Sequence, residues 1–172
     1  MPTLQKNSNS QLHIPIEQVT NNTTSWIGHR PGYNENVISG QTFVSPSEGD
    51  LNNIEIYSSI VTAPGKVSMT LYSFDPLHKS WGKVLGSASI ELNKNDSGKW
   101  IGFNLSGLHL HKGEAYGFRL ESPNTFIGVG EAAGSHKQPP FHNGQEWKFS
   151  TKDNKGHSFS YFSLAFKVGL RA

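Results

Sequence analysis

Apolar and polar residues alternate most clearly between residues 51 and 75. Two sets of apolar residues each share one parity there: Ile54, Ile56 and Ile60, followed by Val67, Met69 and Leu71. Alternation of this kind puts apolar side chains on one face of a β-strand and polar ones on the other. The Pro64-Gly65 pair between the two sets is typical of a turn. The stretch predicts a β-hairpin with one buried face, which needs a second layer to cover it.

Similar segments recur along the chain at a spacing of roughly 8–12 residues, which is typical of a β-sandwich or barrel. Further strands are predicted over residues 41–44, 87–92, 100–105, 114–121, 125–133, 145–151 and 157–170. No segment combines a sustained helical period with helix caps. The 18 glycines and nine prolines agree with many turns. We therefore expect an all-β fold, an antiparallel two-sheet β-sandwich of the jelly-roll type.

The first 40 residues differ from the rest because they are polar and rich in Asn, Ser and Thr. A short apolar run over residues 12–16 predicts one edge strand. The Gly and Pro content of residues 26–33 indicates a loop. We therefore expect residues 1–40 to be an N-terminal arm that packs on a single β-sandwich domain formed by residues 41–172.

Composition and charge restrict the classes of partner. The 172 residues include 15 basic and 13 acidic ones, a formal net charge of +2, without any cluster of more than two basic residues. This balance argues against a nucleic-acid partner, and the apolar runs are too short for membrane insertion. The absence of cysteine excludes disulfides and thiolate metal sites. The first residues lack the apolar core of a secretion signal, so an extracellular or cell-surface location is expected only for a piece of an exported protein.

Several short motifs follow one another from residue 41 onward. They are Gln41-Thr42-Phe43, the segment 71–75, the strand 100–105 with its bulky-Gly-Phe pattern, the segment 110–118 and Phe141-His142-Asn143-Gly144. In this order they resemble the galactose-binding-like jelly-roll domains of bacterial carbohydrate-active and cell-surface proteins. The resemblance implies a non-catalytic, lectin-like module that binds sugar or serves adhesion, and it carries over no defined set of ligand residues.

Sugar binding needs a flat aromatic ring against the C–H face of a pyranose and polar groups that pair with its hydroxyls. Trp81 is the first candidate for the ring, because it lies in a predicted polar loop over residues 76–83. Asp75 and His78 are the nearby candidates for the hydroxyls. The alternative is that Trp81 folds back onto the edge of the sandwich, since large aromatic residues are usually mostly buried.

Two further aromatic groups are candidates for ligand binding. Trp26 is followed by Arg30, whose forked donors suit vicinal hydroxyls, and by Tyr33. The alternative role of Trp26 is to anchor the N-terminal arm. Trp147 with His142 forms the third group, and the alternative is that Trp147 belongs to the core together with Phe149, which has the same parity.

An outward-facing aromatic surface is the basis of a second functional hypothesis. Tyr72, Phe74, Trp100 and Arg119 have the parity opposite to the apolar sets of their own strands. If these strands are neighbours, the side chains form an interaction surface, unless the N-terminal arm covers it. The alternative function is therefore a structural or adhesion domain that binds a protein or forms a homo-oligomer.

His109 and His111 would point the same way on a strand, as metal ligands of cupin-type jelly rolls do. Glu114 follows His111 too closely for that pattern, and the third histidine motif is missing. We therefore expect two exposed histidines, no bound metal and no cofactor, and a metal-dependent enzyme ranks third among the hypotheses. A structural calcium ion is compatible with this fold class, with oxygen ligands from Glu48, Asp50, Asp75 or Asp153.

Catalytic motifs do not emerge from the sequence. Glycoside cleavage requires paired carboxylates, but nearly all acidic residues lie in turns or at strand ends beside Lys or Ser. This is typical of solvated surface charge. Nucleophile-elbow, metalloprotease and phosphate-loop motifs are absent. We expect a binding module rather than an enzyme.

Overall fold

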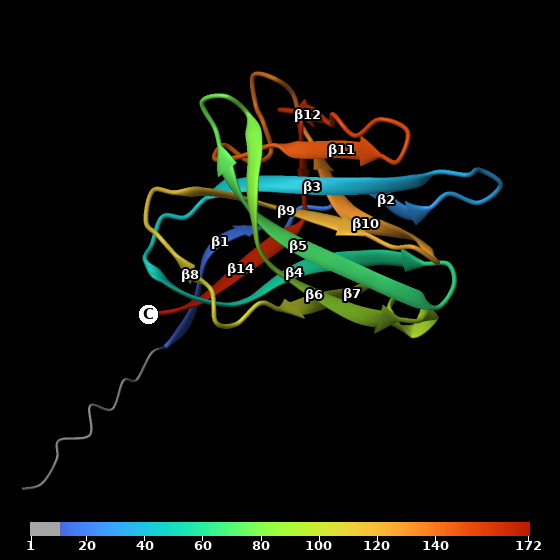
Figure 1. The fold of residues 1–172 in the computed structure, drawn as a ribbon, viewed down its shortest axis with the longest axis horizontal. Helices are drawn as coiled ribbons and strands as arrows, with labels where there is room; N and C mark the ends of the chain where they lie inside the picture. Colours follow the sequence, from blue (N-terminus) through green and yellow to red (C-terminus); the bar gives the residue numbers. More distant parts are fainter. Residues whose placement is uncertain (1–10) are drawn as a thin grey trace, which may run out of the picture.

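The computed structural model describes residues 11–172, which form β-strands and one short 3₁₀ turn, η1 (Lys94–Asp96). The strands are β1 (Leu12–Gln18), β2 (Thr23–His29), β3 (Asn36–Val44), β4 (Gly49–Val61), β5 (Gly65–Asp75), β6 (Ser80–Leu92), β7 (Lys99–Asn104), β8 (His109–Leu110), β9 (Ala115–Glu121), β10 (Phe126–Ala133), β11 (Glu146–Ser150), β12 (His157–Phe159), β13 (Phe162–Leu164) and β14 (Phe166–Arg171) (Figure 1). The prediction of an all-β, antiparallel fold is confirmed. Within this part of the chain, no helix has the length and apolar character needed to cross a membrane.

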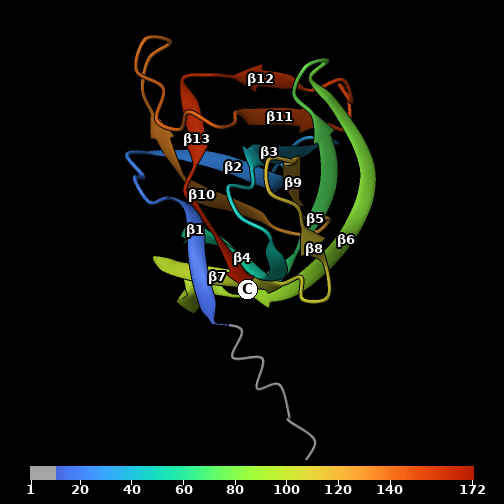
Figure 2. The ribbon, with the colours of Figure 1, turned by 90° about the vertical axis from the view of Figure 1, so that its left-hand side faces the viewer.

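The strands form a single sheet that curls over its own inner face (Figures 1 and 2). Its main path runs β1-β14-β4-β10-β2-β3-β9-β5-β6, and the shorter strands attach at its sides: β7 and β8 to β4, β11 to β3, β12 to β11 and β13 to β10. The curl brings β6 close to β7. The expectation of two separate sheets is not confirmed, because hydrogen bonds link all 14 strands.

The apolar core lies on the inner face of the curl. Its largest fully buried side chains include those of Phe43, Phe103, Phe118, Phe166, Ile54, Ile56, Met69 and Leu71. The predicted inward positions of residues 51–75 are thus buried, with one exception. Ile60 is 43% exposed, because the register of the β4–β10 pairing shifts between Ser58 and Ile60 and reverses the alternation there.

The predicted hairpin over residues 51–75 is wrong in its pairing. β4 and β5 follow each other through a turn at 62–64, but β4 pairs with β14, β10, β7 and β8, whereas β5 pairs with β6 and β9. Alternation records which face of a strand is buried and carries no information about the neighbouring strand. The chain therefore crosses at this turn from one part of the curled sheet to another.

The N-terminal region is part of the sheet. β2 pairs with β10 along its length, and β3 pairs with β9 and β11, so both lie inside the strand order. The predicted loop at 26–33 is wrong over its first half, where β2 continues to His29 and buries Ile27 completely. The predicted boundary at residue 40 falls within β3. The first ten residues of the predicted arm lie outside the described residues.

Candidate functional site

A cleft of about 290 Å³ lies between the β5–β6 turn and the segment 141–145. Its lining residues are Thr42, Phe43, Val44, Phe74, Pro76, Lys79, Ala115, His142, Asn143, Gly144 and Gln145. Phe74 is partly exposed, and Lys79, His142 and Asn143 are exposed. The cleft therefore combines an aromatic ring with an amine, an imidazole and amide groups.

Backbone contacts with β3 hold one wall of this cleft. The Thr42 N–H donates to the carbonyl of Gln145 at 2.9 Å, and the Gln145 N–H donates to Thr42 Oγ1 at 2.9 Å. Gly144 packs so closely on the same strand that an added Cβ would lie 1.8 Å from the Thr42 carbonyl oxygen. Glycine is required there because no side chain fits. The segment 141–145 is thus fixed against the sheet.

The opposite wall is the β5–β6 turn, which Asp75 closes. Its Oδ1 accepts hydrogen bonds from the N–H groups of Leu77 at 3.0 Å and His78 at 3.3 Å, and its Oδ2 is hydrogen-bonded to His78 Nδ1 at 2.7 Å. The bond to the His78 side chain is the main cause that lowers the pKa of Asp75. Lys79 completes the turn at a φ of 49°, a left-handed conformation that favours glycine. Asp75 and His78 therefore serve the turn beside the cleft and do not line it.

Trp81 belongs to β6 and not to a loop as predicted, because this strand begins at Ser80. Its indole makes edge contacts with four rings, at centroid distances of 5.5 Å to Phe74 and Tyr72, 5.6 Å to Phe149 and 5.8 Å to Trp147. The Arg119 guanidinium lies 4.5 Å from the indole centroid and 4.0 Å from that of Phe149. We call these six residues the aromatic cluster.

Two glycines allow Trp81 to lie against the sheet. An added Cβ at Gly117 would come within 2.6 Å of Trp81 Cζ3, and one at Gly40 within 3.1 Å of Cη2. The indole Nε1 is buried without a hydrogen-bond partner among the described residues. Trp81 is thus enclosed by glycine backbone and other rings, as in the alternative that it folds back onto the sheet. Trp81 does not line the cleft but packs against Phe74, which does.

Trp147 lies in the same cluster with 6% of its surface exposed, stacked on Phe149 at 5.9 Å and 12°. Both rings are buried on the face of β11 opposite to Glu146 and Lys148, outside the main apolar cluster. Tyr72, Phe74 and Arg119 also come together on the neighbouring strands β5 and β9, as the outward-face hypothesis requires. Trp100 does not join them: it lies on β7 against Tyr57 at 5.5 Å and under Lys167 at 4.2 Å.

The structure separates Trp26 from Arg30 and Tyr33. Trp26 stacks on Phe126 of β10 with 5.0 Å between centroids and an interplanar angle of 12°. Arg30 lies 4.0 Å over the ring of Tyr33 in the exposed β2–β3 turn. His142 is therefore the one predicted ligand residue that lines the cleft.

The expectation that the acidic residues are surface charges is wrong for Glu131 and Glu146, which are 5% and 0% exposed. Lys148 Nζ lies 3.4 Å from a carboxylate oxygen of each, and it also donates to the Ser25 hydroxyl. These residues face the inner side of the curl, because Lys148 and Glu146 pair with Ser39 and Gln41, which share the inward parity of Phe43. A polar compartment thus lies beside the apolar core.

The two buried carboxyl groups have opposite pKa shifts. Burial raises the pKa of Glu146 to about 9, and the adjacent Glu131 carboxylate adds to the effect. Burial also opposes ionisation of Glu131, but hydrogen bonding to Glu146, the Lys148 charge and the Thr23 hydroxyl outweigh it and lower the pKa. One proton and one lysine charge thus balance two carboxyl groups. The residue types suit acid–base chemistry, but the cleft residues are others.

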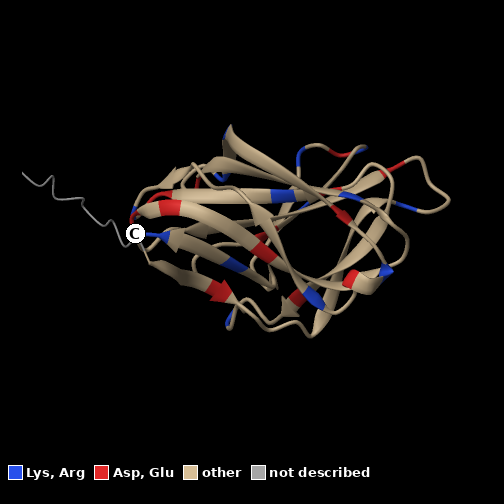
Figure 3. Cartoon of the chain, turned by 90° about the horizontal axis from the view of Figure 1, so that it is seen from below, with Lys and Arg blue, Asp and Glu red and all other residues tan. Residues whose placement is uncertain are grey.

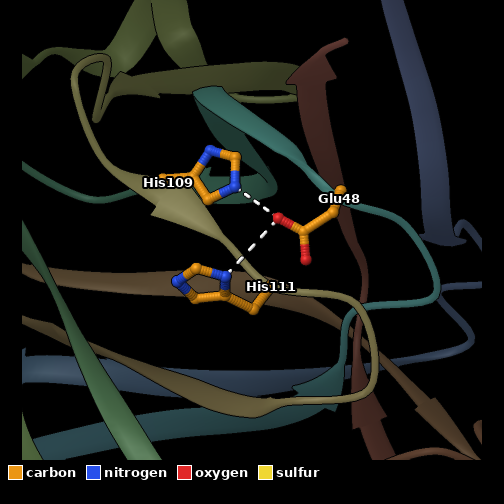
Figure 4. Close-up of side chains that lie close together, drawn as sticks. All are labelled: Glu48, His109 and His111. Carbon is orange, nitrogen blue, oxygen red and sulfur yellow. Dashed lines mark hydrogen bonds and ion pairs between the residues drawn. The ribbon is translucent and has the colours of Figure 1, made fainter.

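Glu48, His109 and His111 are the group within the described residues that could hold a metal ion (Figure 4). Asp50 lies beside them, hydrogen-bonded to His109 at 2.8 Å. The hydrogen bond with Asp50, followed by that with Glu48, raises the pKa of His109. The other two predicted calcium ligands, Asp75 and Asp153, are instead bound to His78 and His157. Elsewhere the acidic and basic positions are interspersed (Figure 3).

Comparison with known proteins does not identify a family for this chain. No protein-family model matches the chain, and no curated protein matches it. The resemblance to galactose-binding-like domains stays a prediction from the sequence motifs.

Proposed function

We propose that this chain is a non-catalytic, jelly-roll carbohydrate-binding module whose ligand site is the cleft between the β5–β6 turn and the segment 141–145. The observation that supports this proposal is the composition of the cleft. Phe74 offers an apolar ring, and Lys79, His142 and Asn143 offer exposed polar groups around it. A sugar ring presents the matching combination of C–H groups and hydroxyls.

The volume of the cleft restricts the size of the ligand that it can hold. Its volume of about 290 Å³ is at the lower end of ligand pockets in proteins. A single sugar ring or the end of a glycan fits such a space better than the middle of a long polymer. The polar groups include a lysine amine, which favours a sugar that carries a carboxylate or sulfate group.

The jelly-roll assignment is supported by the connectivity. The crossing from β4 to β5 between distant parts of a curled antiparallel sheet is compatible with a jelly roll, in which consecutive strands change layers. The cleft is bordered by a turn and a loop segment, and such segments commonly carry binding residues.

The experiment is a screen of neutral and acidic mono- and oligosaccharides on a glycan array, followed by titration calorimetry of the best ligand. Lys79→Gly removes the amine and also relieves the left-handed backbone at a φ of 49°. It should weaken binding of the acidic sugar about 10-fold or more without lowering the unfolding temperature. Lys66→Ala, at the other end of β5, is the matched control and should bind like the parent protein.

Phe74→Leu tests the aromatic face. Leucine keeps an apolar side chain against Trp81 and Trp147 but has no flat ring for a pyranose, so affinity should fall while the fold persists. A folded parent protein that binds no glycan on the array would reject the proposal. So would a glycan affinity that is unchanged in Lys79→Gly, Phe74→Leu and His142→Ala alike.

A further inference from the structure

A second group of polar side chains is assembled by β8 and the start of β4, and none of its residues lines the cleft. Asp50 pairs with His109, and Gly49 pairs with Leu110. This antiparallel register brings Glu48 opposite His111. Leu110 is fully buried, so the alternation along the strand turns His109 and His111 to the same outer side. The backbone therefore gathers two imidazoles and two carboxylates.

Three donor atoms converge within this group (Figure 4). Oε2 of Glu48 contacts Nε2 of His109 and lies 3.4 Å from Nδ1 of His111. All three atoms lie within 4.8 Å of one another. Ligand atoms about 2 Å from a tetrahedral zinc ion are separated by about 3.3 Å. Small rotations of these exposed side chains bring the three atoms to that spacing.

Two other polar atoms of the group, Nδ1 of His109 and Oε1 of Glu48, have hydrogen-bond partners that leave Nε2 and Oε2 facing each other. Asp50 Oδ1 is hydrogen-bonded to Nδ1 of His109 at 2.8 Å, which directs Nε2 toward Glu48. The Lys112 N–H donates to Glu48 Oε1 at 2.8 Å and leaves Oε2 for another partner. A carboxylate on the far nitrogen of a histidine is the usual support of a metal-bound imidazole.

We propose that Glu48, His109 and His111 form a binding site for a divalent transition-metal ion, with zinc as the best match. Two neutral imidazoles and one carboxylate are typical zinc ligands, and water would complete the tetrahedron. Calcium does not suit the site, because it requires oxygen ligands in larger number. Copper(II) and nickel(II) also accept imidazole and carboxylate. The expectation from sequence of two histidines without a metal is replaced by this proposal.

The test is titration calorimetry with zinc chloride on the full chain, after removal of any polyhistidine tag. The parent protein should bind one zinc ion per chain. His111→Ala and Glu48→Gln should each weaken binding by at least about 100-fold, and Asp50→Asn by about 10-fold, in line with the loss of a ligand and of a supporting carboxylate. His136→Ala is the control, since this exposed histidine bonds to Ser160 elsewhere.

A thermal-unfolding series provides the second readout. Excess zinc should raise the unfolding temperature of the parent protein and of His136→Ala, and should leave that of Glu48→Gln unchanged. Absence of zinc binding by the folded parent protein would overturn the proposal. So would a zinc affinity that survives in both His111→Ala and Glu48→Gln.

Discussion

The indole of Trp81 meets the ring of Phe74 edge-on, with 5.5 Å between the two centroids and an interplanar angle of 71°. Trp147 approaches the same ring from β11, with 5.9 Å between centroids. The two tryptophans thus set the orientation of a ring that lines the cleft, while their own surfaces are largely covered. Trp81, which the sequence predicts to contact the ligand directly, instead packs against Phe74 and holds that ring in place at the cleft.

Trp81→Ala should destabilise the protein by about 3 kcal/mol, because it removes a large side chain from a packed cluster and leaves a cavity over Gly40 and Gly117. Urea unfolding followed by circular dichroism measures the change. Leu77→Ala, in the neighbouring turn and 83% exposed, should alter stability by no more than about 0.5 kcal/mol. Equal effects of the two substitutions would contradict the assigned role of Trp81.

Gly117→Ala should displace the same indole without changing any aromatic residue. The added Cβ would lie 2.6 Å from Trp81 Cζ3, which is too close for two carbon atoms, so the ring must move outward. The near-ultraviolet circular dichroism of the aromatic cluster should change. Glycan affinity should also fall, because the moved indole displaces Phe74, which packs against it. A spectrum identical to that of the parent protein would show that Gly117 is not needed for this packing.

Glu146→Gln should change how stability depends on pH. The folded carboxyl has a pKa of about 9 against 4.5 for the ordinary value, so folding takes up a proton between these pH values. The contribution of Glu146 to the free energy of unfolding is therefore present below pH 4.5 and falls as pH rises toward 9, at up to about 1.4 kcal/mol per pH unit.

Glutamine stays neutral and removes this term, so the variant should be the more stable protein at pH 8 and should approach the parent protein at pH 5. Urea unfolding at several pH values gives the difference curve. Glu91→Gln, at an exposed position of β6, should show a flat difference. A flat difference for Glu146→Gln as well would mean that the buried carboxyl is ionised at neutral pH.

Lys148→Met should destabilise the protein by about 3 kcal/mol at pH 7, because the Glu131 carboxylate loses the ammonium group at 3.4 Å and stays buried. The triple substitution Glu131→Gln, Glu146→Gln and Lys148→Met removes all the charges together and should recover most of the loss. Urea unfolding compares the two variants. A triple variant less stable than Lys148→Met would indicate that other contacts of Glu131 or Glu146 dominate.

Alternation predicted most of the strands and their buried faces, because period-two burial is a local property of the sequence. Strand pairing is not local, so the pattern around the turn at 62–64 predicts a hairpin although β5 pairs with β6 and β9. The sequence leaves open whether Trp147 binds a ligand or belongs to the core. Trp147 and Phe149 are both buried, while Glu146 and Lys148 occupy the inner face of β11.

The candidate sites show the same limit. His142 is a sequence candidate as a polar neighbour of Trp147, but the cleft depends on the contact of its segment with β3, which is not local in the sequence. The spacing of His109 and His111 is visible in the sequence, whereas Glu48 lies 61 residues from His109 in the chain. Only the register of β4 with β8 brings that carboxylate to the imidazoles. Residue types were visible in the sequence, and their neighbours were not.

The polar residues inside the curl also affect the register in which β11 pairs with β3. Lys148 faces Ser39 and Glu146 faces Gln41 across the β3–β11 ladder. If the register of β11 shifted by two residues toward the end of β3, the carboxyl of Glu146 would lie opposite the phenyl ring of Phe43. Lys148 would then no longer lie opposite Ser39. Such a misaligned register would bury the carboxyl group of Glu146 against an apolar ring without a polar partner, which costs free energy. The polar side chains of the interior thus help to specify the register of β11 on β3. Alternation of apolar and polar residues alone would also allow a register shifted by two residues.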